Sequence, residues 1–527
     1  MSRVPLLSVL QRSLTTAFLA GALLAPGASA NAQSHPSDDP VLERIWTEAM
    51  ENSHLERMGL QLLDSIGPRL TGSPGIDRGH DWAVQTLGSW GIEARNESYG
   101  TWRGWDRGTT HIDLIEPRVR TLEGMMSAWS PATDGPVEGP VVTIPEWSTR
   151  AELDAWMANE VPGAFVAISF PQPTCRPDSH YANFGTEGAL ERMQTARQEA
   201  AEAFQERLPA NANEFRLMLE EAGAAGILQS LWPGDIGIQR IFGTNTERTP
   251  TLELSCEDYG LVSRLAENGM GPRLRVNASA QALGEVPVYN TIGVIRGTEL
   301  PDEYVLLSAH FDSWDGASGA TDNGTGSILM LETMRILSEV YPNPRRTIMV
   351  GLWGGEEQGL NGSRRFAAMH PEITENLQAL FNQDNGTGRV MNISTQGLLE
   401  AGEHWGRWLS QIPDEVTRHI NLQLPGIPSS GGTDHASFIC AGAPAFSLGA
   451  HPWSYFTHTW HTNRDTFDKV VFEEVRNNAV LVASLAYLAS EDPEPVSRER
   501  RVLPVSPQTG ERMTWPECQP GQERFGG

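Results

Sequence analysis

Several acidic and imidazole residues of this sequence stand directly after runs of apolar residues that are typical of buried strands. The runs cover residues 304–308, 347–352 and 379–382, and the polar residues that follow them are His310, Asp312, Glu356, Glu357 and Asp384. Open α/β sheets hold their ligands outside the carboxyl ends of the strands. These side chains are therefore expected to meet at one edge of a sheet.

So many carboxylates at one place need a cation, because like charges at short range raise one another's pKa and lose their solvation. Imidazole and carboxylate ligands together favour Zn²⁺, with Co²⁺ or Mn²⁺ as substitutes. In His310-Phe311-Asp312 the alternation of a strand end places both polar side chains on one side. Asp312 is therefore expected to accept a hydrogen bond from the second ring nitrogen of His310.

The Gly-rich loop of residues 316–326 bends over the predicted sheet edge and opens a helix. Asp322, inside this loop, is expected to bridge two metal ions. The adjacent residues Glu356 and Glu357 lie on an irregular loop, where neighbouring side chains can point in different directions. One of the two is expected to bind a metal, while the other acts as the general base toward an activated water. The pattern thus predicts metal-assisted hydrolysis.

A further imidazole comes late in the chain, from either His458 or His461. Each histidine alone would more often be structural, but beside the acidic positions one of them is expected to complete the metal site. Trp314, Tyr455 and Trp460 flank these motifs and either line an apolar pocket or belong to the core.

The elements that carry these residues alternate between apolar strands and helices, which is typical of a mostly parallel, doubly wound α/β sheet. Helices are predicted at residues 76–90, 326–338 and 473–490, and a further strand at 445–448. In the last helix apolar residues recur in steps of four, three and four, at Val475, Ala479, Val482 and Ala486. They form one face of a helix.

The chain of 527 residues is long for a single hydrophobic core, so two folded units are expected. Residues 129–285 differ from the rest in their sequence pattern, which consists of short β-like runs. Inside them, the polar stretch 187–208 predicts a solvent-exposed helix, with a lid or a homodimer contact as the alternatives. Residues 493–527 read as an irregular tail.

Residues 1–30 have the layout of a cleavable secretory signal, with an apolar run followed by Ala28-Ser29-Ala30. Its removal takes away Arg3 and Arg12 and changes the formal charge from −27 to −29. A surface this acidic repels nucleic acid and anionic membranes. No later apolar run is long enough to span a membrane. The expected location is secreted or periplasmic.

The four cysteines are Cys175, Cys256, Cys440 and Cys518. They are too few and too scattered for a disulfide scaffold or a CxxC zinc site. In an oxidising compartment one or two disulfides can form, and the sequence does not fix their pairing.

Between residues 304 and 471 the sequence resembles the M28 family of di-zinc peptidases. The resemblance rests on six blocks in the family's order, at residues 308–315, 319–324, 356–359, 384–388, 432–434 and 461–466. Six blocks in one order form a specific signature.

This resemblance implies two zinc ions. One would be bound by His310, Asp322 and Asp384, and the other by Asp322, Glu357 and His461. It implies Glu356 as the base, and it favours His461 over His458 because the family pattern is a His-Thr followed shortly by Asp-Thr.

The activity implied is that of an exopeptidase acting on short peptides, of the aminopeptidase or the dipeptidase and carboxypeptidase type. Thr433 and Asp434 are the candidate substrate contacts, unless their loop only braces the site. The implied fold is a mixed, mostly parallel sheet of the zinc-exopeptidase type. A β-rich protease-associated (PA) domain at 129–285 would be inserted between residues 31–128 and 286–492.

Two positions depart from the family pattern. Ser430 stands where some relatives have a Tyr that stabilises the oxyanion, and Asn323 stands where many have a second Asp. The alternatives are a non-catalytic receptor or binding scaffold of this fold, and a single-zinc acyltransferase similar to the glutaminyl cyclases. Every ligand position is filled, and the presence of both His310 and Asp384 favours the two-metal peptidase.

Overall fold

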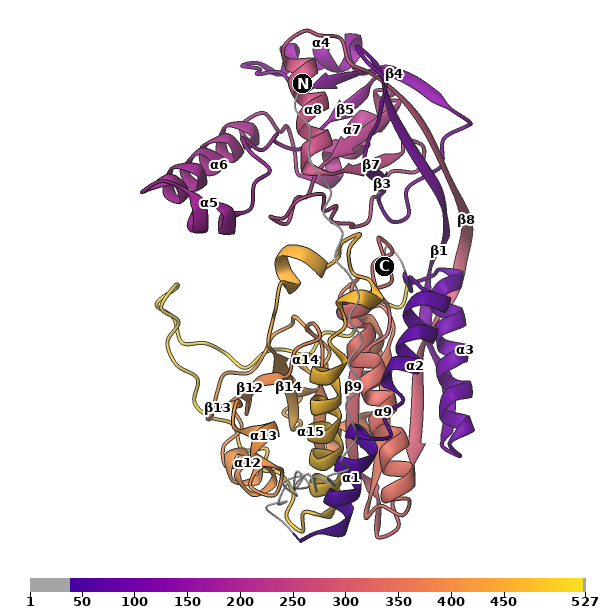
Figure 1. Cartoon of the computed structure of the whole chain (residues 1–527), viewed down its shortest axis with the longest axis vertical. Helices are drawn as coiled ribbons and strands as arrows, with labels where there is room; N and C mark the ends of the chain where they lie inside the picture. Colours follow the sequence, from indigo (N-terminus) through magenta and orange to yellow (C-terminus); the bar gives the residue numbers. More distant parts are fainter. Residues whose placement is uncertain (1–37, 525–527) are drawn as a thin grey trace, which may run out of the picture.

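The computed structural model describes residues 38–524, and the predicted signal peptide lies outside them (Figure 1). Two long antiparallel strands, β1 (Glu93–Glu116) and β8 (Arg273–Ile295), run along one side of the molecule as a ribbon. The upper half in Figure 1 is the chain between these strands, residues 117–272, and the lower half is the remainder. The ribbon is therefore a covalent and hydrogen-bonded link between the halves.

The sheet of the lower half has the order β13-β12-β14-β11-β9-β10-β8. Its remaining strands are β9 (Leu300–His310), β10 (Arg346–Trp353), β11 (Leu377–Asn382), β12 (Val390–Ser394), β13 (Asn421–Gln423) and β14 (Ala445–Ala450). The central strands β10, β9, β11 and β14 are parallel to one another, whereas β10 is antiparallel to β8 and β14 is antiparallel to β12. All four are largely apolar, as expected for strands covered on both faces. The strands predicted from the sequence are confirmed.

Helices cover both faces of this sheet (Figure 1). The longer ones are α1 (Pro40–Met50), α3 (Pro74–Ser89), α9 (Thr325–Val340), α10 (Asn361–Met369), α12 (Ala401–Leu409) and α15 (Phe472–Glu491). The shorter helical pieces are α2 (Leu55–Gly59), η1 (Leu60–Ile66), η2 (Ala320–Gly324), α11 (Pro371–Glu375), α13 (Asp414–Thr417), α14 (Ala436–Ile439), η3 (Tyr455–Thr459) and η4 (Phe467–Lys469). The three helices predicted from the sequence correspond to α3, α9 and α15.

Local sequence explains where these helices begin. The side chain of Ser73 accepts a hydrogen bond from the Ile76 amide, and Pro74 occupies the first turn of α3. Both are favoured at a helix start, because a side-chain hydroxyl accepts a hydrogen bond from a backbone amide that has no partner in the helix, and proline has no amide hydrogen to satisfy. The α3 helix thereby starts close to the loop that carries Arg69.

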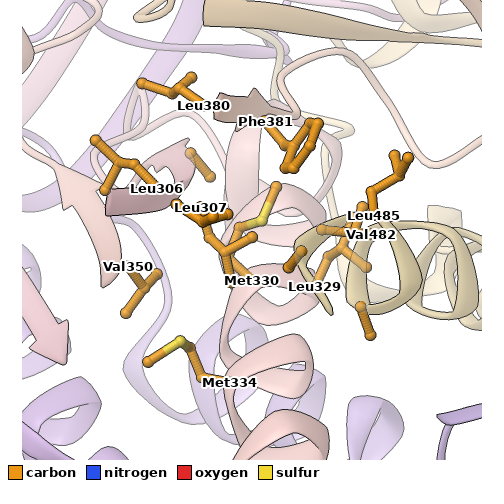
Figure 2. Close-up of a cluster of buried hydrophobic side chains, with 14 of the residues drawn as sticks. Leu306, Leu307, Leu329, Met330, Met334, Val350, Leu380, Phe381, Val482 and Leu485 are labelled. Atoms are coloured by element: carbon orange, nitrogen blue, oxygen red, sulfur yellow. The ribbon is translucent and has the colours of Figure 1, made fainter. Parts of the chain in front are cut away.

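The main core lies between the sheet and helices α9 and α15 (Figure 2). Leu307 and Phe381 of the strands lie toward Met330 and Leu329 of α9 and Val482 and Leu485 of α15, whereas Leu306 and Leu380 point to the opposite face of the sheet. Each such side chain contributes about 1.5–3 kcal/mol when it is fully buried. This packing fixes the strand ends from which the polar residues project.

The upper half continues the same sheet beyond β8 in the order β4-β5-β6-β7-β3. Its elements are β2 (Arg120–Thr121), β3 (Gly124–Met126), β4 (Val137–Thr143), α4 (Arg150–Asn159), β5 (Phe165–Ala167), α5 (Asp178–Phe184), α6 (Ala189–Gln205), α7 (Ala212–Glu221), β6 (Gly226–Gln229), β7 (Thr251–Leu254) and α8 (Cys256–Glu267). The helix predicted at 187–208 is α6, which projects to one side with α5 (Figure 1).

The description of this region as β-rich needs correction, since its strands are short and α4, α7 and α8 were not predicted. These helices are only 10 to 12 residues long. Helix α4 buries only Leu153, so its periodic signal in the sequence is weak. The upper half is therefore a mixed α/β layer packed on two apolar clusters, one of which also includes Leu70 and Trp314 of the lower half.

Two disulfides join the four cysteines, Cys175 to Cys256 and Cys440 to Cys518. The first anchors the segment before α5 to the start of α8, and the second anchors the C-terminal tail behind α14. Among residues 38–524 we find no helix with the length and apolar character that crossing a membrane requires.

Candidate metal centre

The predicted metal-binding residues come from five different segments that meet at the carboxyl edge of the lower sheet. His310 is the last residue of β9, Asp322 lies in η2, and Glu357 follows β10. Asp384 follows β11, and His461 follows η3. The parallel order of β10, β9 and β11 brings three of these segments side by side.

Their side chains form two groups of three that share Asp322. In the first group, His310 Nε2 lies 3.2 Å from Asp322 Oδ1 and 3.1 Å from Asp384 Oδ1. In the second, His461 Nε2 lies 3.2 Å from Asp322 Oδ2 and 2.9 Å from Glu357 Oε2. Each group has the composition and spacing to hold one metal ion. The two oxygens of Asp322 thus face different imidazoles.

Several polar atoms of this cluster lack hydrogen-bond partners within residues 38–524. Asp322 Oδ2 and Glu357 Oε1 are buried without a donor. An unpaired buried carboxylate oxygen is costly unless a cation or a donor compensates it. The donor set of two imidazoles and three carboxylates fits zinc.

The charges of the site also favour a bound cation. Burial raises the pKa of Glu356 well above its usual range, and the carboxylates of Asp384 and Asp434 raise it further against the opposing effect of His310. Burial likewise raises the pKa of Glu357 to about 7, with Asp322 adding to the shift. These carboxylates repel one another as negative charges, and a divalent ion removes that repulsion.

Asp312 contacts the centre in a different way from the one predicted. The second ring nitrogen of His310, Nδ1, lies 3.0 Å from the backbone oxygen of Asp312, whereas the nearest carboxylate oxygen is 3.6 Å away. The carboxylate instead accepts hydrogen bonds from the amides of Glu356 and Glu357, at 3.1 and 3.3 Å. Asp312 therefore orients His310 with its carbonyl group and the Glu356-Glu357 turn with its side chain.

The two candidate substrate contacts are buried. Thr433 is 8% exposed, and its hydroxyl accepts a hydrogen bond from Asn382 at 2.8 Å. Asp434 is fully buried, and burial raises the pKa of its carboxyl to about 7. This placement favours a bracing role for the loop, and direct contact with a substrate stays a prediction.

Of the two competing histidines, His461 lies in the cluster and His458 lies outside it. His458 Nδ1 is 3.0 Å from Asp235 Oδ2 of the upper half. The left-handed backbone of His461, with φ of 59°, turns its ring toward Asp322 and Glu357.

Two further residues shape the site, and the sequence analysis gave neither of them a role. The buried guanidinium of Arg69 donates to the carbonyls of Phe311, Gly67, Ser318 and Gly319 at 2.7–3.0 Å. Asp465 accepts hydrogen bonds from the amides of Thr321 and Asp322 at 2.7 and 3.0 Å. Arg69 lies more than 240 residues before its partners Phe311 and Ser318, so no local pattern reveals the contact. Asp465 belongs to a motif block that suggested its importance but not its role.

Asn323, which departs from the family pattern, has a structural role. Its side-chain amide donates to the carbonyl of Gln383 at 2.9 Å, and its oxygen accepts from the Gly326 amide at 3.1 Å. It therefore joins the Asp322 turn to the segment that carries Asp384.

Comparison with known proteins agrees with this arrangement. Residues 290–486 match the model of Peptidase family M28. Human carboxypeptidase Q is 26% identical over 450 residues, which is 85% of this chain and 87% of that protein.

Two solved structures share the fold. A peptidase M28 precursor from Shewanella amazonensis SB2B superposes with a TM-score of 0.63 at 23% identity, covering 88% of this chain and 98% of the other. The zinc aminopeptidase of Bacillus subtilis superposes with a TM-score of 0.52 at 17% identity, covering 84% and 97%.

The α/β fold and the buried imidazole and carboxylate cluster define a metallopeptidase. Residues 290–486 therefore form a domain that matches Peptidase family M28.

Proposed function

We propose that this protein is a secreted or periplasmic exopeptidase that cleaves short peptides with two zinc ions. His310, Asp322 and Asp384 would hold one ion, and Asp322, Glu357 and His461 the other. The observation that carries this proposal is the bridging geometry of Asp322. Its two oxygens lie 3.2 Å from two different imidazoles.

When bound, zinc in such a centre lowers the pKa of a water molecule and polarises the scissile carbonyl. The carboxylate of Glu356 is the base in this reaction. It accepts the proton of the attacking water and then delivers it to the nitrogen of the leaving amine. The carboxylate of Asp312 fixes the position of Glu356 by accepting a hydrogen bond from its backbone amide. The indole nitrogen of Trp314 orients Glu357 by donating a hydrogen bond to its Oε2 at 2.8 Å.

The exopeptidase assignment is supported by the relatives, whose names include carboxypeptidase Q and zinc aminopeptidase. They recognise opposite ends of a peptide, so both specificities belong to the test. We propose the domain division 31–128, 129–285 and 286–492, with the middle part as an inserted PA-like unit. The pairing of β1, which precedes that part, with β8, which leads out of it, supports an insertion.

Export from the cytoplasm is supported by the two disulfides, which form in oxidising compartments. The predicted signal at residues 1–30 would direct that export.

The test combines elemental analysis of the purified mature protein with a substrate panel. The panel contains an amino-acid anilide, an unblocked dipeptide, an N-blocked dipeptide and a peptide with an N-terminal glutamine. We expect two zinc ions per chain and hydrolysis of one of the first three classes. Absence of both zinc and hydrolysis after zinc addition would support a binding scaffold. One zinc with cyclisation of the glutamine peptide would support the acyltransferase.

A further inference from the structure

A segment of the upper half, Asp235 to Phe242, lies directly against the loop that carries His461. The Ile241 amide donates to the carbonyl of His461 at 2.7 Å, and the Asn463 amide donates to the carbonyl of Gln239 at 3.0 Å. Asn463 Oδ1 accepts in return from the Gln239 amide at 2.9 Å. The upper half therefore pairs with the backbone at His461 and directly after it.

These hydrogen bonds hold His461 in a backbone conformation that is unfavourable for a residue with a Cβ. His461 has a φ of 59°, in the left-handed region where a residue with a Cβ costs about 1–2 kcal/mol. Such a conformation persists when the surroundings determine it. Here the determining hydrogen bond comes from Ile241, more than 200 residues earlier in the chain.

The contacts that hold the ring of His461 differ from those that hold the ring of His310. His310 Nδ1 contacts the carbonyl of Asp312, the usual way in which a second ring nitrogen fixes a ligating histidine. His461 Nδ1 is buried and has no hydrogen-bond partner within residues 38–524. Some other contact must hold this ring.

Aromatic packing supplies that contact. The rings of Trp460 and His461 lie 3.9 Å apart, centre to centre, and Phe242 meets the His461 ring edge-on at 4.9 Å. The guanidinium of Arg240 lies over Trp460 at 4.8 Å from its centre, and it donates to the carbonyl of Phe456 at 2.7 Å. Two side chains of the upper half thus contact His461, one directly and one through Trp460.

We propose that Arg240 and Phe242 are positioning residues that orient His461 as a ligand of the second zinc ion. This inference rests on the proposed two-zinc function. It makes the upper half a structural part of one metal site, while the first site is built entirely by the lower half. Loss of these contacts should therefore lower the affinity for one zinc ion and leave the affinity for the other unchanged.

The experiment measures the stepwise zinc affinities of full-length mature variants by competition with a chromophoric chelator. In Phe242→Ala and Arg240→Ala we expect the zinc affinity that His461→Ala also lowers to fall about tenfold or more, as for other residues behind a ligand. The affinity of the other ion should stay within twofold of wild type.

Two variants serve as matched controls. Phe204→Ala removes a partly buried phenylalanine from another cluster of the upper half. Arg500→Ala removes a comparable stacking contact, at 4.6 Å from the ring of Trp515. Both should keep both wild-type zinc affinities, because Phe204 packs against the cluster that contains Phe215 and Leu219, and Arg500 stacks on Trp515.

The outcomes separate the inference from the function on which it rests. Wild-type protein that binds fewer than two zinc ions, or His461→Ala that binds two at wild-type affinity, would overturn the proposed metal centre. A normal wild type together with normal affinities in Phe242→Ala and Arg240→Ala would overturn only the positioning role. If thermal melting shows that these variants do not fold, Phe242→Leu decides, and an unchanged second affinity in it contradicts the inference.

Discussion

The carboxylate of Asp312 is fully buried and accepts hydrogen bonds from two consecutive backbone amides, those of Glu356 and Glu357. Thr71 donates a third hydrogen bond to it at 3.2 Å. A carboxylate that receives three donors has its charge well compensated. Asp312 therefore holds the turn on which the proposed base and one proposed ligand lie.

Glu356→Gln should keep both metal ions and lose most of the turnover. Glutamine has nearly the shape of glutamate but cannot accept the proton of the attacking water. General-base catalysis typically contributes 10²–10⁴-fold, so a loss of about that size is expected in kcat. Steady-state kinetics and elemental analysis of the same preparation measure both properties. Turnover close to wild type would show that Glu356 is not the base.

Asp384→Ala should have the opposite effect on metal content. Its Oδ1 lies 3.1 Å from His310 Nε2, inside the first group of three. With that oxygen gone, the ion held there loses one of three proposed protein ligands, and the metal content after dialysis should fall toward one ion per chain. An unchanged ratio of metal to protein would exclude Asp384 as a ligand.

At the scale of elements, strand β7 of the upper half carries a buried acid, Glu253. Burial raises its pKa to about 8, against the opposing hydrogen bond from the Leu231 amide and the charges of Arg216 and Arg240. Tyr259 is buried beside it. Glu253 is thus largely protonated at neutral pH.

This shift predicts a pH dependence of stability. Between the ordinary pKa of 4.5 and about 8, the folded protein holds a proton on Glu253 that the unfolded chain has released. The free energy of unfolding should therefore decrease as pH rises through this window, by up to about 1.4 kcal/mol per pH unit. Glu253→Gln should flatten this slope in urea titrations at pH 6 and 8. A variant with the wild-type slope would contradict the assignment.

The C-terminal tail is a second element whose position follows from long-range contacts. Cys518 ties it to Cys440, and beyond that disulfide the Gln522 amide donates to Asn361 at 2.8 Å. The carbonyl of Glu523 accepts from the Thr101 amide of β1, also at 2.8 Å. The tail therefore links the helix after the Glu356-Glu357 turn to the ribbon between the halves.

Replacing Cys440 and Cys518 together with Ser should free this tail. The disulfide joins residues 78 apart, and closing a loop of that size contributes about 4 kcal/mol. We expect a lower free energy of unfolding and faster proteolytic cleavage within residues 519–524. Replacing Cys175 and Cys256 is the matched control, since that disulfide lies in the upper half and should leave the tail protected. Equal cleavage rates in both double variants would contradict this role.

At the scale of the whole molecule, the formal charge of −27 destabilises the folded state through repulsion between like charges. Many like charges on one surface repel each other, and salt screens that repulsion within about 10 Å at 0.1 M ionic strength. The protein should therefore melt at a higher temperature in sodium chloride than in dilute buffer.

The expected change is a rise of about 2 °C or more in Tm between 0.05 and 1 M sodium chloride, measured by scanning calorimetry. Sodium chloride is preferred to sulfate, because sulfate also strengthens hydrophobic burial. A constant or falling Tm would mean that stabilising ion pairs, such as the buried Arg335–Glu332 pair, outweigh the net repulsion.

The fold class and the proposed ligands could be predicted because both have local signals. Strands β9, β10 and β11 are apolar runs, and each ends at the polar residues in question. Helices α4, α7 and α8 were missed because they are short. The carboxylate of Asp312 was assigned the wrong partner, because strand alternation gives the side of a residue but not the atom that reaches a ring nitrogen.

The sequence by itself determined which residues gather at the sheet edge, since strand ends and motif order are properties of neighbouring residues. Only the tertiary structure decided what surrounds them. It paired the four cysteines, placed Arg69 and Asp465 behind the candidate metal centre, and brought Arg240 and Phe242 of the upper half onto the His461 loop. Most of these contacts join residues many tens to hundreds of positions apart. They depend on how the ribbon and the sheet fold the chain back on itself, and no local pattern encodes that.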